Sequence, residues 1–245
     1  MARQRLDLML VQRGLIPSRE QAKRLIMAGE VLVGDELITK PGWLVRADAV
    51  LTVKEPPRFV SRGGLKMEGA LEHYGIDVTG MVALDVGAST GGFTDCLLQR
   101  GVVKVYAFDV GTNQMVWKLR SDPRVVCREN FNVRHMQATD VPELVDIIVA
   151  DVSFISLTLV LPGALQVLKP GGQAVVLVKP QFELSREEVG KGGIVREPEL
   201  HVKACERIRQ FVESQPDLEW RGLVESAIQG TDGNREFLAW FVKVA

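Results

Sequence analysis

Apolar residues in the first fifty positions recur first with helical spacing and then in short strand-like runs. Leu6 and Leu10 share one helical face, and Gly14 follows them as a stop signal. A second helix is predicted in PSREQAKRLIMAGE, where Ser18 suits the N-cap position. The runs VLV and LIT on either side of GDE predict a hairpin, and AVLTV predicts a further strand. The pattern indicates a small α+β domain over residues 1–55.

From residue 61 onward, apolar runs alternate with helix-like segments. The runs are MVALDV, VVKVYAFDV, RVVC, VDIIVADV, QAVVLVK, GLVESA and EFLAWFVKV. Strands that alternate with helices are typical of a doubly wound, mostly parallel sheet. Only IQGTDGNR separates the last two runs, which is too short for a helical crossover, so the last strand is predicted to be antiparallel to its neighbour. We therefore expect an α/β domain over residues 61–245, after a proline-containing linker at 56–60.

The net charge of −1 is unevenly distributed between these domains. Residues 1–58 contain ten Lys/Arg and seven Asp/Glu, a net charge of +3, whereas the remainder contains twenty and twenty-four, a net charge of −4. No apolar run reaches the roughly 18 residues of a membrane span, and the N-terminus lacks a signal-peptide core, so a cytoplasmic protein is expected. The three cysteines and three histidines lack the spacing of a metal site, so no metal is expected.

Basic side chains of the small domain are candidates for contact with RNA. Arg19 and Lys23 share an exposed face of the second predicted helix, and Lys40 follows the hairpin. Cationic side chains attract phosphates irrespective of nucleotide sequence. The string SREQAKRLIMAGEVLV, followed by ITKPG, resembles the RNA-binding domain first described in ribosomal small-subunit protein S-four. That resemblance implies that the RNA-binding residues are Arg3, Arg5, Arg19, Lys23, Arg24 and Lys40.

The segment LDVGASTGGFTDCLL joins a predicted strand to a predicted helix through small residues. In a doubly wound sheet such a turn lies beyond the carboxyl ends of the strands, where a cofactor approaches the backbone closely. Asp109, at the end of the next strand, is placed to bind ribose hydroxyls. The spacing D-x-G-x-x-x-G-G resembles the S-adenosylmethionine loop of class I (Rossmann-like) methyltransferases, and it disfavours a nicotinamide dehydrogenase. The candidate cofactor-binding residues are Asp85, Gly87, Ala88, Ser89, Thr90, Gly91, Gly92, Phe93, Asp109 and Asp151.

Four charged residues are predicted to meet at one edge of this sheet. Asp151 ends the fourth strand and Lys179 the fifth, Lys66 lies near the start of the helix before the first strand, and Glu236 begins the last strand. In order and element they resemble the Lys-Asp-Lys-Glu tetrad of FtsJ-like ribose 2′-O-methyltransferases, which implies catalytic roles. A ribose hydroxyl is a poor nucleophile, so a lysine would accept its proton while the carboxylates orient the lysines. This chemistry requires no metal.

Further motifs extend the resemblance over the whole chain. SRGGLK, DVGASTGGFTD, DVSFIS, VKPQFE and GKGGIVR follow the small domain in this order, and the chain is thereby identified as a member of the TlyA family, which carries an old haemolysin label. The resemblance implies an S-adenosylmethionine-dependent ribosomal RNA (cytidine-2′-O)-methyltransferase that acts on ribosomal RNA or ribosomal subunits. One alternative is a non-catalytic ribosome-binding or assembly factor. Another is a membrane-active haemolysin, which the lack of an amphipathic or apolar membrane segment disfavours. The oligomeric state stays open.

Overall fold

A computed structural model of the protein describes residues 3–54, 57–230 and 232–244. The chain divides into two compact units, residues 1–58 and 59–245. The division falls within the linker expected at 56–60. Residue 56 of this linker and the preceding residue 55 lie outside the described residues. Phe59, which the sequence analysis assigned to the linker, is buried in the core of the larger unit.

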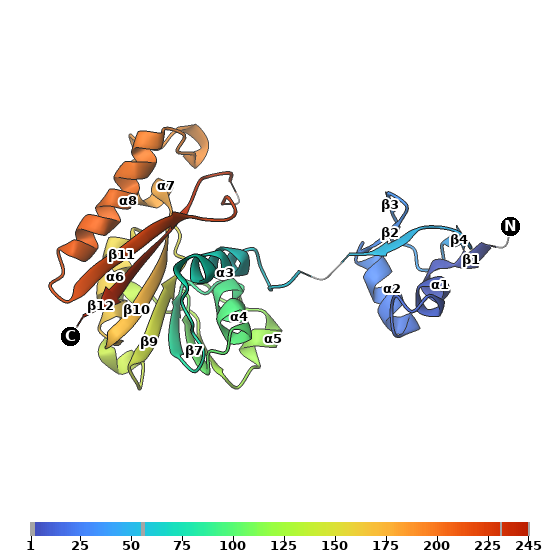
Figure 1. Ribbon diagram of the computed structural model, residues 1–245, viewed down its shortest axis with the longest axis horizontal. Coiled ribbons are helices and arrows are strands. Elements are labelled where there is room, and N and C mark those ends of the chain that lie inside the picture. Colours follow the sequence, from blue (N-terminus) through green and yellow to red (C-terminus); the bar gives the residue numbers. More distant parts are fainter. Residues whose placement is uncertain (1–2, 55–56, 231, 245) are drawn as a thin grey trace. The chain divides into compact units, whose positions relative to one another are not determined.

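The N-terminal unit has two helices packed on short strands (Figure 1). Ser18 caps the second helix, because its side chain accepts a hydrogen bond from the backbone N–H of Gln21 at 3.2 Å. Strands β1 and β4 pair with each other and were not predicted, since three residues are too few for an alternating pattern. The elements are β1 (Arg3–Arg5), α1 (Leu6–Gln12), α2 (Arg19–Met27), β2 (Val31–Val33), β3 (Glu36–Leu37), β4 (Leu44–Arg46) and β5 (Leu51–Val53).

The larger unit is built on a seven-stranded sheet with the order β11-β12-β10-β9-β6-β7-β8. Strands β6 to β10 pair in parallel, and β12 is antiparallel to both of its neighbours, β10 and β11. This arrangement confirms the predicted α/β class and the antiparallel last strand. The strands are β6 (Val82–Val86), β7 (Lys104–Phe108), β8 (Val125–Arg128), β9 (Val145–Ala150), β10 (Leu168–Val178), β11 (Leu218–Glu225) and β12 (Phe237–Lys243).

Helices cover both faces of this sheet (Figure 1). Side chains from α3 and α4 form one buried cluster with the sheet, and side chains from α6 and α8 form another on the opposite face. The helices are α3 (Gly63–Tyr74), α4 (Gly92–Gln99), α5 (Trp117–Arg120), α6 (Leu157–Leu165), α7 (Pro180–Glu183) and α8 (Pro198–Glu213), with short 3-10 turns at Val133–His135, Ala138–Asp140 and Lys191–Gly193.

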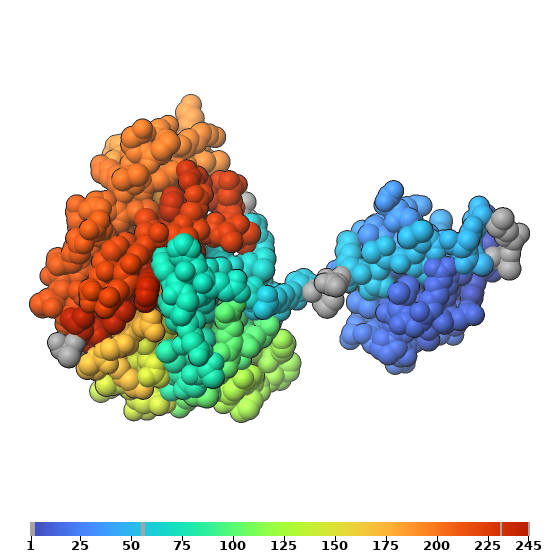
Figure 2. All heavy atoms as spheres, in the orientation of Figure 1, coloured from blue at the N-terminus to red at the C-terminus, as the bar shows by residue number. Residues whose placement is uncertain are grey.

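Two strands begin earlier than their apolar runs suggested. Strand β10 starts at Leu168, whereas the predicted apolar run begins at Gln173. Between them, Pro170 and two glycines interrupt the apolar pattern, and the pairing register with β9 shifts. Strand β11 likewise starts at Leu218, before the predicted GLVESA run. Figure 2 shows the atoms of α3, in teal, against those of the β11–β12 hairpin, in red. The fold thus brings together segments that lie more than 150 residues apart in the sequence. Lys66 and Glu236, for example, are 170 residues apart and contact each other.

Candidate active site

The glycine-rich loop between β6 and α4 is held between the ends of neighbouring strands. The backbone N–H groups of Gly87 and Ala88 both donate to the carbonyl of Phe108, at 2.8 and 3.2 Å. Gly87 has a φ of +78°, and a Cβ there would lie 2.5 Å from the backbone oxygen of Asp151. Any side chain at Gly87 would therefore force the loop away from β9, which explains why the turn needs a residue without a side chain.

Asp109 fixes the opposite side of this loop. Its carboxylate accepts hydrogen bonds from the backbone N–H of Ser89 and from that of Gly111, both at 2.7 Å. Ser89 adopts a left-handed conformation with a φ of +48°, and the hydrogen bond that its N–H donates to Asp109 supports this conformation. Asp109 lies where the sequence predicted, directly after β7, and it both orients the loop and faces a cavity.

Two cavities flank the loop and share Gly87, Ser89 and Asp151 in their walls. One, of about 430 Å³, is lined mainly by apolar side chains such as Phe108 and Phe131, with Asp109 at its wall. The other, of about 330 Å³, is more polar, and its lining includes all four tetrad residues and five residues of the 87–92 loop. An apolar recess with a carboxylate thus lies beside a more polar, charged recess, and the two share part of their walls.

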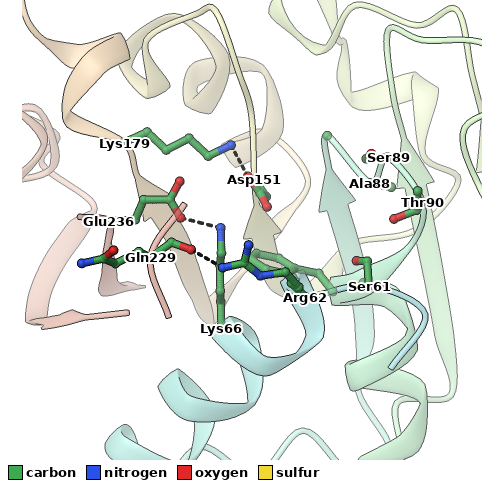
Figure 3. A pocket seen from close by; sticks show the side chains of 14 residues that line it. Ser61, Arg62, Lys66, Ala88, Ser89, Thr90, Asp151, Lys179, Gln229 and Glu236 are labelled. Atoms are coloured by element: carbon green, nitrogen blue, oxygen red, sulfur yellow. Dashed lines mark hydrogen bonds and ion pairs between the residues drawn. The ribbon is translucent and has the colours of Figure 1, made fainter. Parts of the chain in front are cut away.

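Strand register explains why the tetrad residues converge. Ala150 pairs with Val86, so Asp151 comes next to Gly87 at the end of the sheet. Val178 pairs with Phe237 of the antiparallel strand, so Lys179, which follows Val178, and Glu236, which precedes Phe237, are neighbours at the same edge. All three side chains therefore point into the polar cavity from adjacent strands (Figure 3).

The first lysine–carboxylate pair is Lys179 with Asp151. The Nζ atom of Lys179 lies 2.6 Å from Oδ1 of Asp151 and donates a hydrogen bond to Oγ of Ser153 at 2.9 Å. The lysine side chain is 11% exposed and the aspartate 24% exposed, so both charges retain a path to the cavity. Ser153 was not predicted as a site residue, although it lies within the quoted motif DVSFIS.

The second pair is Lys66 with Glu236, which form a close ion pair (Figure 3). Their side chains are 10% and 4% exposed, so this pair is more deeply buried than the first. Lys66 comes from α3, whose preceding residue Arg62 donates a hydrogen bond to the backbone oxygen of Gln229 at 2.7 Å. Arg62 and Gln229 also line the cavity and were not predicted. The hairpin carrying Glu236 is thus fastened to α3 at two points.

Two of the candidate cofactor residues lie behind the loop and line neither cavity. Gly91 has a φ of +100° and a Cβ there would meet Leu119 at 2.3 Å, so its role is to let α5 approach. Asp85 is fully buried, and Thr94 donates a hydrogen bond to its Oδ2 atom at 2.6 Å. Its Oδ1 atom has no hydrogen-bond partner among the described residues. Burial raises the pKa of the Asp85 carboxyl to about 7.

The six cations of the N-terminal unit that are predicted to contact RNA fall into two groups. Arg5 and Arg19 both hydrogen-bond to Asp7, a fully buried aspartate, with each Nε atom 3.0 Å from a carboxylate oxygen. The hydrogen bonds from Arg5, and then those from Arg19, lower the pKa of Asp7 to about 2. Arg19 therefore links α2 to α1, and Arg5 links the end of β1 to α1, while the contact of both arginines with RNA stays a prediction. No ion-pair partner occurs in the described part of the chain for the other four cations predicted to contact RNA, which are Arg3, Lys23, Arg24 and Lys40.

Two features are absent from the residues that the structure describes, a metal-binding cluster and a helix that could span a membrane. Over residues 3–54, 57–230 and 232–244, no group of three or more His, Cys, Asp or Glu side chains is arranged to hold a metal ion. Within the same ranges, no helix is both long enough and apolar enough to cross a membrane.

Comparisons with known proteins agree with this geometry. The FtsJ-like methyltransferase family matches residues 59–243, and the S4 domain family matches residues 4–51. The Mycobacterium tuberculosis protein named 16S/23S rRNA (cytidine-2′-O)-methyltransferase TlyA is 43% identical over 97% of this chain and 89% of its own. Hemolysin A of Brachyspira hyodysenteriae is 41% identical over 97% of this chain and 99% of its own.

The fold of this chain is also similar to a solved structure, that of a Streptococcus thermophilus protein named as a hemolysin. It is 47% identical, covers 100% of this chain and 90% of its own, and superposes with a TM-score of 0.75. The sequence, the domain order and the fold therefore indicate the same family. The chain belongs to the FtsJ-like methyltransferase family, and to the TlyA family that its motifs predict.

Proposed function

We propose that this protein transfers a methyl group from S-adenosylmethionine to the ribose 2′-hydroxyl of a cytidine in ribosomal RNA. The observation that carries the proposal is the presence of two lysine–carboxylate pairs, Lys179 with Asp151 and Lys66 with Glu236, in one cavity beside the glycine-rich loop. The choice of cytidine follows the name of the Mycobacterium tuberculosis relative.

The residues around the loop fit this cofactor. Phe108 and Phe131 offer an apolar recess for the adenine, and Asp109 retains carboxylate lone pairs for ribose hydroxyls. The backbone of residues 87–92 would approach the methionine part, next to Asp151. When bound, the cofactor supplies an electrophilic methyl group on a positively charged sulfur.

Lys179 is the residue best placed to handle the proton of the acceptor hydroxyl. During methyl transfer, Lys179 would accept the proton that the acceptor hydroxyl loses and would pass it on to solvent. Asp151 and Ser153 fix the Nζ atom, so little reorganisation is needed during transfer. Lys66, held by Glu236, supplies a fixed positive charge that stabilises negative charge developing on the oxygen.

An exposed aromatic residue at the mouth of the site suits a nucleic-acid substrate. Phe154 is 91% exposed, adopts a left-handed conformation with a φ of +64°, and lies 5.1 Å from the ring of Phe182. Phe154 directly follows Ser153, which touches Lys179. RNA-modifying enzymes stack unpaired bases on such side chains, so Phe154 would hold the base of the target nucleotide. The N-terminal unit would add phosphate contacts through Lys23, Arg24 and Lys40.

The test is methyl transfer to ribosomal RNA from cells that lack this protein. Purified protein with radiolabelled S-adenosylmethionine should label ribosomal subunits or their RNA, and mapping of 2′-O-methylation should locate the label on cytidine ribose. Lys179→Ala protein is the control for contaminating activities. A protein that binds ribosomes but transfers no methyl group would be a non-catalytic binding or assembly factor, and the proposal would be wrong.

A further inference from the structure

The turn that follows β7 is held by the carboxylate of Glu129, the residue directly after β8. The Glu129 side chain is 10% exposed and accepts hydrogen bonds from three consecutive backbone N–H groups. Those of Asn113 and Gln114 lie at 2.7 and 2.8 Å, and that of Met115 lies at 3.2 Å. Asn113 is left-handed with a φ of +54°, a conformation that persists only where the surroundings hold it. Glu129 therefore fixes the backbone of this turn.

Further bonds fasten the turn to the walls of the cofactor site. The guanidinium of Arg120 pairs with Glu129 at 2.5 Å, so the carboxylate does not stand as an isolated charge. The backbone N–H of Val116 donates to the carbonyl of Thr90, in the glycine-rich loop, at 3.3 Å. On the other side, the carbonyl of Gly111 accepts a hydrogen bond from the segment after β8 at 3.0 Å. The turn is therefore part of the same rigid frame as the loop.

The side chain of Gln114 lies on the cavity side of this turn. Gln114, Asp109 and Gly111 all line the apolar cavity of about 430 Å³. A Cβ at Gly111 would lie 2.8 Å from Cγ of Gln114, 3.1 Å from its Nε2 atom, and 3.1 Å from Oδ1 of Asp109. The amide and the carboxylate thus flank one small space, which the missing side chain of Gly111 leaves open.

The amide of Gln114 has hydrogen-bonding capacity that the protein does not use. It forms no hydrogen bond with the residues that the structure describes, whereas Asp109 already accepts bonds from the backbone of Ser89 and Gly111. An ionised carboxylate can only accept hydrogen bonds, but an amide both donates and accepts them. Two adjacent hydroxyl groups, each a donor and an acceptor, are matched by a carboxylate and an amide side by side.

We infer that Gln114 binds the ribose of the cofactor beside Asp109, from a turn that Glu129 positions. The inference rests on the proposed use of S-adenosylmethionine. Asp109 would accept a hydrogen bond from one ribose hydroxyl, and the amide of Gln114 would bond to the other. Because Glu129 already orders the backbone of the turn, binding needs to order only the side chain of Gln114. Glu129 lines neither cavity and acts through the turn, so it is a positioning residue.

Calorimetry of the full chain with S-adenosylhomocysteine, the by-product of methyl transfer, and with its 2′-deoxy and 3′-deoxy forms tests the contact. Gln114→Ala should bind the parent compound roughly three- to tenfold more weakly than wild type, the range expected for one hydrogen bond. For one of the two deoxy forms, the loss of affinity relative to the parent compound should be clearly smaller in Gln114→Ala than in wild type, because the missing hydroxyl has already lost its partner.

A merely structural role of Gln114 would weaken the binding of all three ligands by the same factor. That result, or wild-type affinity of Gln114→Ala for S-adenosylhomocysteine, would overturn the inference. The matched control is Gln210→Ala, an exposed glutamine of α8 that lines neither cavity, and it should bind all three ligands as wild type does. No binding of S-adenosylmethionine or S-adenosylhomocysteine by wild type would instead overturn the proposed function.

The positioning role of Glu129 is tested in the same assay. Glu129→Gln should weaken binding of S-adenosylhomocysteine, and adding Gln114→Ala to it should weaken binding little further, since both changes act on one contact. Glu143→Gln is the matched control, because Glu143 pairs with Lys104 before the start of β9 and lines neither cavity. It should bind as wild type does. Fully additive losses in the double variant would show that Glu129 does not act through Gln114. If Glu129→Gln does not fold, the deoxy series with Gln114→Ala still decides the ribose contact.

Discussion

Lys179 Nζ lies 2.6 Å from Oδ1 of Asp151, across the carboxyl ends of two adjacent parallel strands. The pairing of Val176 with Ala150 sets this contact, because Asp151 follows β9 directly and Lys179 follows β10 directly. The amine is thereby held at the ends of two paired strands, as a group that must meet a hydroxyl oxygen in a fixed position requires.

Replacement of Lys179 should abolish methyl transfer without abolishing binding. Lys179→Ala should lose on the order of a hundredfold or more in rate, the usual scale for a positioned proton acceptor. Lys179→Arg should fail too, since a guanidinium stays protonated at any working pH and cannot accept the hydroxyl proton. Single-turnover methyl transfer at saturating cofactor and RNA measures both rates. Unchanged cofactor affinity in calorimetry is the control. A near-normal rate for Lys179→Arg would show that Lys179 does not accept the proton and acts only through its positive charge.

The deeply buried pair of Lys66 and Glu236 should matter for stability as well as rate. Glu236→Ala leaves the Lys66 charge buried without its partner, which typically costs about 3–5 kcal/mol. The double variant Lys66→Met with Glu236→Ala should recover much of that stability but no activity, because the fixed positive charge is gone. Denaturant unfolding and methyl transfer on the same preparations separate the two effects. Equal stability of the single and double variants would contradict the pairing.

The sequence was sufficient to place residues that follow parallel strands. Asp109, Asp151 and Lys179 each come directly after an apolar run, and the carboxyl ends of parallel strands must meet at one edge. The contact of Lys66 with Glu236 could not be derived from such periodicity. It depends on β12 lying between β10 and β11, a non-local pairing, while the sequence indicated only that the strand is antiparallel to its neighbour.

Local patterns also could not distinguish an RNA-facing cation from a structural one. Helical spacing put both Arg19 and Lys23 on an exposed face, but Arg19 bonds to Asp7, whose burial results from the packing of α1 against α2. In the same way, the sequence placed Asp85 in the cofactor motif without showing that its side chain lies on the far side of the loop, bonded to Thr94. Which side of a segment is buried is a tertiary property.

The two groups of N-terminal cations should respond differently to substitution. Combined replacement of Lys23, Arg24 and Lys40 by Ala should weaken binding to ribosomal RNA and lower its salt dependence, by roughly one unit of log–log slope per lost phosphate contact. Unfolding of the N-terminal unit should not change, since these side chains form no ion pair in the described residues. RNA binding at a series of salt concentrations, together with thermal unfolding, measures both. If the triple variant bound RNA as tightly as wild type at every salt concentration, these cations would not contact RNA and would belong to an ordinary solvated surface.

Arg19→Ala, by contrast, should destabilise the N-terminal unit even without RNA. It removes one of the two arginines that hold the buried carboxylate of Asp7, and hydrogen bonds to charged groups contribute about 1.5–3 kcal/mol. Because the pKa of Asp7 is lowered to about 2, its stabilising effect should be present above about pH 4 and lost as the pH falls toward about 2. Thermal unfolding across that range should show the gap between Arg19→Ala and wild type closing in acid. A gap that is constant with pH would contradict the role of Asp7.

Asp85→Asn should raise the stability of the larger unit at neutral and alkaline pH. Burial raises the folded-state pKa of Asp85 to about 7, whereas an aspartate in the unfolded chain titrates near about 3.9. The folded state therefore binds a proton more tightly, and wild type should lose stability relative to the variant as the pH rises from about 4 to about 7, with no further change above that. A shift from about 3.9 to about 7 corresponds to about 4 kcal/mol, or roughly 10 °C in melting temperature. Calorimetric melting of both proteins in the absence of ligand measures the difference, and a difference that does not vary with pH would mean that Asp85 is already ionised in the free protein.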